Sequence, residues 1–204
     1  MAFPRIVGTA VPFMQINIDT DQIVPGDWMF RAPTVGHAAG LFGNKRYNAD
    51  LTLNPEFILN REPWKSARIL LADRNFGCGS SREEAPMALR EFGFRSIIAP
   101  SFGSIFFVNC FRNGIVAVEL PIEKVLVLAD EAKASGGTAV MEVDLEAQTV
   151  KAASGEVFSF TSPVRPRQMI LKSVDEIGLT LTYGSKIEAF RQTDRARRPW
   201  AYPV

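Results

Sequence analysis

The stretch Arg68-Ile69-Leu70-Leu71-Ala72, followed by Asn75-Phe76-Gly77-Cys78-Gly79-Ser80-Ser81-Arg82, indicates the fold class of this chain. A short apolar run bounded by polar residues is typical of a buried strand. After the glycine-rich turn, residues 87–92 suit a helix, and Gly93 is placed to end it. Strand, turn and helix in this order predict a parallel β-α-β unit.

The same alternation continues on both sides of this unit. Towards the C-terminus we predict strands at 96–99 and 115–120 and helices at 102–111, 125–132 and 185–193. Residues 5–13 form a further predicted strand, which closes on a turn at 17–21. Residues 139–145 and 156–160 alternate, with 148–152 between them, and together they predict a small antiparallel sheet. We therefore expect one α/β domain over residues 1–204 with a parallel-strand core, and a long loop at about 26–54 as a lid or interface.

Composition excludes several partners. The chain has 204 residues, 47% hydrophobic and 22% charged, with a formal net charge of +1. Such a balance gives no general attraction to nucleic acid or to an anionic membrane. No stretch approaches the roughly 20 apolar residues that span a bilayer, and the first residues do not resemble a secretion signal. We expect a cytoplasmic protein.

The sequence contains few cysteine and histidine residues that could bind a metal. Cys78 and Cys110 are the two cysteines and His37 is the single histidine. They are too few for a disulfide framework, a four-cysteine iron-sulfur site or a Cys/His zinc site. We therefore predict no metal or cofactor site within this chain and expect any metal to come from another chain. His37 is expected to be an exposed loop residue with no partner to orient it.

The glycine-rich turn is a candidate anion site. A strand that runs into Gly77 and Gly79 and then into a helix collects free backbone N–H groups at the positive end of that helix. The turn is not a dinucleotide fingerprint, because Arg82 stands where the third glycine would be, and no G-K-[ST] follows to make a P-loop. Arg82 adds a planar group that binds carboxylates.

Simple helix capping is the alternative explanation of the two serines. Ser80 with Glu83, and Ser81 with Glu84, both match the capping box. Pro86 would lie inside a helix that is capped at Ser81, which favours a helix that begins at Pro86 instead.

Three ordered segments and one near the end closely resemble the small subunits of 3-isopropylmalate dehydratase, in the aconitase superfamily. They are Asn17-Ile18-Asp19-Thr20-Asp21-Gln22-Ile23-Val24-Pro25, Asn75-Phe76-Gly77-Cys78-Gly79-Ser80-Ser81-Arg82-Glu83, Ile98-Ala99-Pro100-Ser101-Phe102-Gly103 with Asn109-Cys110-Phe111-Arg112-Asn113-Gly114, and Asp175-Glu176-Ile177-Gly178-Leu179-Thr180-Leu181. The resemblance covers nearly the whole chain. It implies a swivelling β/β/α domain that docks on a large subunit, in a heterodimer or heterotetramer, with a 4Fe-4S cluster on that subunit.

The resemblance also implies roles for single residues. Ser80 would be the base that removes a carbon-bound proton from a small dicarboxylic hydroxy acid. The implied substrate contacts are Ser81, Arg82, Gly79 and Arg31, and the implied supporting residues are Asp19, Asp21, Cys78 and Ser101. The implied reaction is the dehydration and rehydration that isomerises 2-isopropylmalate to 3-isopropylmalate in leucine synthesis.

Two departures from the family wording leave the substrate open. Glu84 stands where the family has histidine, and residues 26–31, in the loop that helps to read the substrate side chain, are unusual. A related hydratase for dimethylmalate, methylmalate or homoaconitate is therefore an alternative, and non-catalytic anion binding or protein binding are alternatives of a different class.

Several other features have structural explanations beside the functional ones. Asp19 and Asp21 suit a turn better than a metal site. Cys78 fills space between glycines unless the helix start lowers its pKa. The basic tail, with Arg191, Arg195, Arg197 and Arg198, is a solvated surface or a docking contact.

Overall fold

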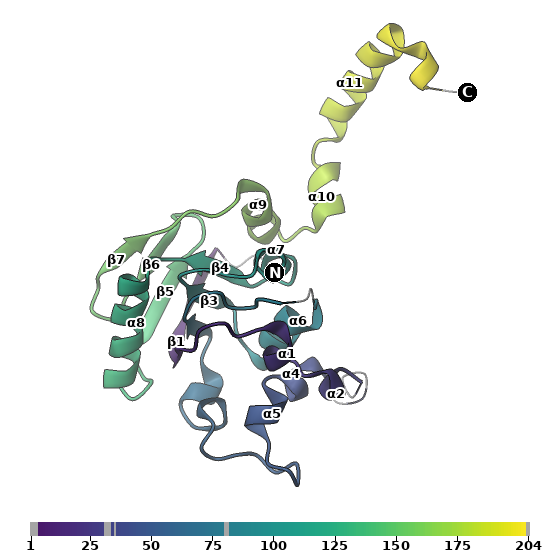
Figure 1. Ribbon diagram of the computed structural model, residues 1–204. Coiled ribbons are helices and arrows are strands. Elements are labelled where there is room, and N and C mark those ends of the chain that lie inside the picture. The colour runs from purple at the N-terminus through teal and green to yellow at the C-terminus, as the bar shows by residue number, and fades with distance from the viewer. Residues whose placement is uncertain (1–3, 31–33, 35, 80–81, 203–204) are drawn as a thin grey trace.

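A single seven-stranded sheet organises the chain in a computed structural model that describes residues 4–30, 34, 36–79 and 82–202 (Figure 1). Its strand order is β4-β3-β2-β1-β5-β6-β7. The strands are β1 (Arg5–Phe13), β2 (Ile69–Ala72), β3 (Ser96–Ala99), β4 (Val116–Glu119), β5 (Val140–Asp144), β6 (Thr149–Lys151) and β7 (Val157–Ser159). Strands β1 to β4 pair in parallel, and β5 to β7 continue the same sheet in antiparallel pairs. The predicted α/β fold with a parallel core is confirmed, but the antiparallel strands are not a separate sheet.

Strand β1 joins the two halves of the sheet. Residues Arg5 to Thr9 pair with β5, whereas residues Ala10 to Phe13 pair with β2. The sequence of β1 reflects this division, because its second half is buried on both faces and its first half is mixed.

Helices follow the parallel strands as the sequence predicted. They are α6 (Glu84–Phe92), α7 (Ser104–Arg112) and α8 (Ile122–Ala134). Helix α8 packs on β1, β2 and β3, while α7 packs on β4. Helix α6 begins at Glu84, so neither serine of the turn is its N-cap residue and the helix does not start at Pro86. Pro86 fits in the first turn because the N–H that it lacks would have no partner there.

The segment predicted as a long loop contains short helices. These are α1 (Thr20–Ile23), just before it, and α2 (Gly26–Met29), α4 (His37–Gly40) and α5 (Gly43–Arg46) within it; the 3-10 turns η1 (Ile58–Asn60) and η2 (Trp64–Ser66) follow. Leu41 and Phe42 are fully buried in the core. Each helix is only one turn long, which explains why no helical period is visible in the sequence.

The C-terminal part leaves the body of the molecule. Helix α9 (Val164–Lys172) packs on α7, and α10 (Glu176–Leu181), α11 (Gly184–Arg197) and η3 (Pro199–Ala201) then project outwards as an arm (Figure 1). Helix α11 confirms the helix predicted at 185–193, whereas α9 and α10 were not predicted from the sequence as helices. In the described part of the chain, no helix is long and apolar enough to cross a bilayer.

Candidate active site

Three segments meet where β1, β2 and β3 end. The backbone of residues 17–20 lies beside residues 74–78, with hydrogen bonds from Gly77 N to Ile18 O (2.7 Å) and from Thr20 N to Cys78 O (3.0 Å). Phe76 N in turn donates to Ser101 O (3.1 Å). Since the carboxyl ends of parallel strands share one edge of a sheet, motifs far apart in sequence are brought together there. These are the segments that carry the family resemblance.

A cleft of about 240 Å³ opens at this edge. Its lining residues are Thr20, Asn75, Gly77, Cys78, Gly79, Arg82, Gly103, Ser104, Ile105 and Phe106. At two positions the neighbouring atoms lie so close that only glycine fits. A Cβ at Gly77 (φ +72°) would overlap the Phe106 ring, and one at Gly103 would overlap the Gly77 carbonyl. The glycine-rich turn is therefore packed tightly against the start of α7.

Two helices begin beside the cleft. Helix α7 has no side-chain cap at Gly103, and its first residues, Ser104 to Phe106, line the cleft. Helix α6 begins two residues after Arg82. The first N–H groups of a helix lack partners within the helix and carry partial positive charge. The cleft therefore suits an anion, and the sequence had indicated only the α6 contribution.

Arg82 is held in position by the segment that follows β1. Its Nη1 donates to Val24 O (3.2 Å) and to Met29 Sδ (3.1 Å), and its Nη2 forms an ion pair with Asp21. The Arg82 side chain is 24% exposed, compared with 60% for Asp21. Arg82 thus lies on the cleft wall with both terminal nitrogens of its guanidinium held by residues 21–29, and its remaining N–H groups can donate to a carboxylate in the cleft.

The remaining predicted supporting residues hold the backbone. Asp19 caps α1 by accepting from Gln22 N (2.7 Å), and Ser101 Oγ accepts from Asn75 N (2.9 Å). Cys78 is half-buried, and burial, followed by the nearby charge of Asp19, raises the pKa of its thiol. Cys78 is therefore suited to filling space rather than to acting as a thiolate. In the described ranges, no group of three or more His, Cys, Asp or Glu residues is placed to hold a metal ion.

Three of the predicted site residues, Ser80, Ser81 and Arg31, lie outside the described residues. Gly79 and Arg82, which flank the two serines in sequence, both line the cleft. Thr20, Asn75 and Ile105 also line it, although the sequence pattern did not single them out. Thr20 lies between Asp19 and Asp21, so its place in the motif was the available signal.

His37 is not the isolated loop residue that the sequence predicted. It lies half-buried in α4, where its Nδ1 is 2.9 Å from Glu91 Oε1, while Ala38 N donates to Glu91 Oε2 (3.1 Å). Burial raises the pKa of Glu91, but the hydrogen bonds from His37 and Ala38 outweigh it and lower that pKa overall. The Glu91 carboxylate therefore fastens the start of α4 to α6.

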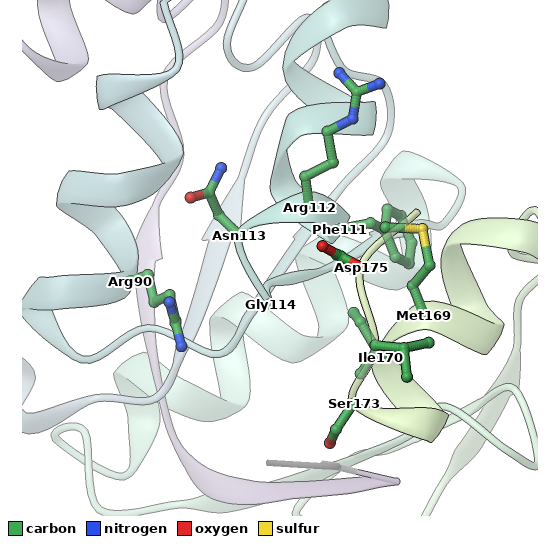
Figure 2. A pocket seen from close by; sticks show the side chains of 10 residues that line it. Arg90, Phe111, Arg112, Asn113, Gly114, Met169, Ile170, Ser173 and Asp175 are labelled. Carbon is green, nitrogen blue, oxygen red and sulfur yellow. The ribbon is translucent and has the colours of Figure 1, made fainter. Parts of the chain in front are cut away.

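A second cleft of similar size, about 230 Å³, is lined by residues of two other segments that carry the family resemblance, 109–114 and 175–181 (Figure 2). It is formed at the end of α7 by Phe111, Arg112 and Asn113 and, across from them, by α9 and the turn at Ser173. Among the described residues of the glycine-rich turn, none lines this second cleft, so we place the candidate site at the first one.

Comparisons with known proteins identify the family of this chain. Three family models match in succession: the Aconitase C-terminal domain at residues 2–123, LeuD_N at 127–161, and, at 176–204, the C-terminal domain of the 3-isopropylmalate dehydratase small subunit.

Curated relatives match along the whole chain. The 3-isopropylmalate dehydratase small subunit of Cupriavidus necator is 48% identical over 197 residues, which are 96% of this chain and 95% of that protein. The corresponding protein of Roseobacter denitrificans is 44% identical over 198 residues, 97% of this chain and 98% of that protein. A crystal structure of 3-isopropylmalate dehydratase from Methanocaldococcus jannaschii has a similar fold, with a TM-score of 0.62 and 21% identity over 93% of this chain and 99% of that chain. This chain belongs to the family of 3-isopropylmalate dehydratase small subunits.

Proposed function

We propose that this chain is the small subunit of a two-subunit hydro-lyase that isomerises 2-isopropylmalate to 3-isopropylmalate by dehydration and rehydration in leucine synthesis. The relatives that carry this name match the chain from end to end. The observation that carries the proposal is the placement of Arg82, because a fixed guanidinium beside two helix starts suits a substrate with two carboxylates.

We assign the proton transfer to Ser80 and the binding of one substrate carboxylate to Arg82 and Ser81. The support is their order in the chain: Ser80 and Ser81 stand between Gly79 and Arg82, which both line the cleft. In the dehydration step, Ser80 removes a proton from carbon while the hydroxyl leaves the neighbouring carbon. In the rehydration step, Ser80 returns a proton to the carbon that lost the hydroxyl, while a hydroxyl adds to the carbon that lost the proton. Arg82 would keep the substrate in register with Ser80 during both steps.

We propose that the site is completed by a large subunit, which also carries a 4Fe-4S cluster. The whole sequence has two cysteines, and Cys110 is fully buried, so this chain cannot surround such a cluster. When bound, the cluster supplies the Lewis acid for the leaving hydroxyl. A large subunit would also exclude water from the open cleft, which would strengthen the electrostatic effect of Arg82.

The side chain of the substrate is the least constrained part of this proposal. Glu84, at the first position of α6, is half-buried two residues after Arg82. It adds negative charge where the family has histidine. We retain isopropylmalate because the relatives named for it are up to 48% identical. We further propose that the enzyme acts in the cytoplasm and that residues 1–204 work as one swivelling unit whose 26–54 segment responds to substrate.

Reconstitution with the large subunit tests the proposal. The complex should turn over 2-isopropylmalate, and Ser80→Ala should abolish turnover. Arg82→Lys keeps the charge but loses the bidentate geometry, so it should lower kcat/KM by about 10–100-fold. Arg74→Lys, at an exposed arginine that precedes the glycine-rich turn and does not line the cleft, is the matched control and should leave kcat/KM unchanged.

A panel of substituted malates separates the remaining possibilities. Equal or better turnover of dimethylmalate, methylmalate or homoaconitate would refute the assigned substrate and leave the reaction class in place. An absence of turnover with every substrate, in a complex that assembles and holds its cluster, would refute the enzymatic function and favour an anion-binding module.

A further inference from the structure

The arm formed by α10, α11 and η3 is poorly covered by the rest of the chain. Helix α11 packs mainly on η3, the turn that follows it, and both project away from the sheet (Figure 1). An isolated helix of this length, 14 residues, is marginally stable in water. A helix that protrudes in this way needs another surface to hold it.

The base of the arm is anchored firmly. Arg112, at the end of α7, donates to Glu176 Oε1 from Nε (3.1 Å) and Nη2 (2.9 Å). Asp175 caps α10 by accepting from Gly178 N (2.6 Å), and Leu179 is buried. Figure 2 shows Arg112 and Asp175 at this junction, beside Phe111 and Met169. These contacts join the start of α10 to the end of α7.

The arm exposes large apolar side chains along its length. Ile177 and Leu181, one turn apart on α10, are 70% and 72% exposed. Phe190 on α11 and Trp200 on η3 are 61% and 76% exposed. Single exposed apolar residues are normal, but four on one projecting element indicate a contact surface for another protein.

The tip of the arm is preorganised. Asp194 accepts from Arg198 Nε and Nη2 (both 2.7 Å) and from the Tyr202 hydroxyl (2.8 Å). The side chain of Asp194 is only 9% exposed. This network folds the chain back after α11 and presents Trp200 outwards. Aromatic residues fixed before binding are effective anchors, because little conformational entropy is lost on association.

The charge of the arm distinguishes between its possible binding partners. Residues 184–202 contain five Lys or Arg and two acidic side chains, a net charge of +3. Asp194, one of the two acids, is engaged by Arg198. If two copies of the chain paired through this segment, two segments of the same net charge would meet. The partner surface should therefore be apolar at its centre and acidic at its rim.

We propose that the arm is the docking element for the large subunit, with Leu181, Phe190 and Trp200 as apolar anchors and Arg191 and Arg195 facing acidic groups. This inference rests on the proposed function. The comparisons support it, because the aconitase C-terminal domain model ends at residue 123 whereas the arm is matched by a model specific to the small subunits. The arm would hold the two chains together permanently. The cleft would not be part of this lasting contact.

Binding of full-length variants to an immobilised large subunit tests the proposal. Leu181→Asp/Phe190→Asp should raise Kd by at least about 30-fold, because it places charge in the apolar centre. Turnover at saturating small subunit should stay near that of the wild type, since no cleft residue changes. Val157→Asp, at another exposed apolar position on β7 (55%), is the matched control and should bind normally. Ser80→Ala should bind normally but give no turnover.

The charge component has its own test. Arg191→Glu/Arg195→Glu should weaken binding and flatten its dependence on salt. Unchanged affinity of both arm variants would overturn the proposal. So would sedimentation of the isolated chain as a dimer that Phe190→Asp dissociates, which would make a second copy the occupant. If the wild-type complex forms without turnover, the proposed function fails, and the binding data still decide the role of the arm.

Discussion

Gly77→Ala tests whether the glycine-rich turn is as tightly packed against α7 as the structure shows. Gly77 has φ +72°. The Phe106 ring occupies the space that a side chain at this position would need, so a Cβ would overlap it. Phe106 is 3% exposed, so displacing its ring would disturb the side chains packed around it. The substitution therefore adds two separate costs to the folded state.

The magnitude follows from these two costs. An alanine in the left-handed region costs roughly 1–2 kcal/mol, and overpacking a core adds about 1–3 kcal/mol. We expect a total loss of about 2–5 kcal/mol in the free energy of unfolding. For a chain of this size, each kcal/mol lowers Tm by about 2–4 °C. The expected fall in Tm is therefore about 4–20 °C.

Gly136→Ala is the matched control for this prediction. Gly136 has φ +61°, and no atom lies within 4 Å of a Cβ built there, so only the backbone cost applies. Urea unfolding followed by circular dichroism gives both free energies. Equal losses in the two variants would refute the close approach of Gly77 to Phe106. Phe106→Leu should recover part of the loss when it is combined with Gly77→Ala, but not when it is combined with Gly136→Ala.

Three further substitutions test single contacts. Asp21→Asn should raise KM of the reconstituted enzyme by about 3–10-fold, because Arg82 loses its ion pair. It should change the free energy of unfolding by less than about 1 kcal/mol, because Asp21 is largely exposed. The pKa of Glu91 is lowered in the folded state, so its contribution to stability is present above its ordinary pKa of about 4.5 and is lost as pH falls below it; Glu91→Gln should flatten urea stability across that acid range. Asp194→Asn should speed amide hydrogen exchange at residues 195–202 and leave exchange in the sheet unchanged, as mass spectrometry would show.

Local signals in the sequence were sufficient for the elements of the sheet but not for its assembly. The continuous apolar runs at β2 and β3 predicted buried parallel strands, and Gly93 marked the end of α6. That β1 pairs with β2 through one half and with β5 through the other is a tertiary choice between segments about 60 and 130 residues away. Alternation alone cannot distinguish a separate antiparallel sheet from an extension of the first.

The sequence singled out some residues of the candidate cleft and not others, because only local patterns can be read from it. Gly77, Gly79 and Arg82 form a contiguous pattern whose local chemistry is readable from the sequence. The residues that fix Arg82 lie 53 to 61 positions earlier, and nothing near Arg82 indicates them. The partner of His37 was invisible for the same reason, since Glu91 is 54 positions away.

The starts of α6 and α7 beside one cleft limit what this chain can do alone. Each helix start contributes at most about 2 kcal/mol, so the two together lower a hydroxyl pKa by roughly 3 units at best. A serine hydroxyl ionises so far above neutral pH that a shift of this size leaves Ser80 a poor base. The remainder must come from Arg82 and from exclusion of water, and the cleft at residues 75–79 and 103–106 is open to solvent in the isolated chain. A second surface over this cleft is therefore a chemical requirement of the proposed reaction, and docking through the arm would supply it while the cleft itself stays able to open for substrate.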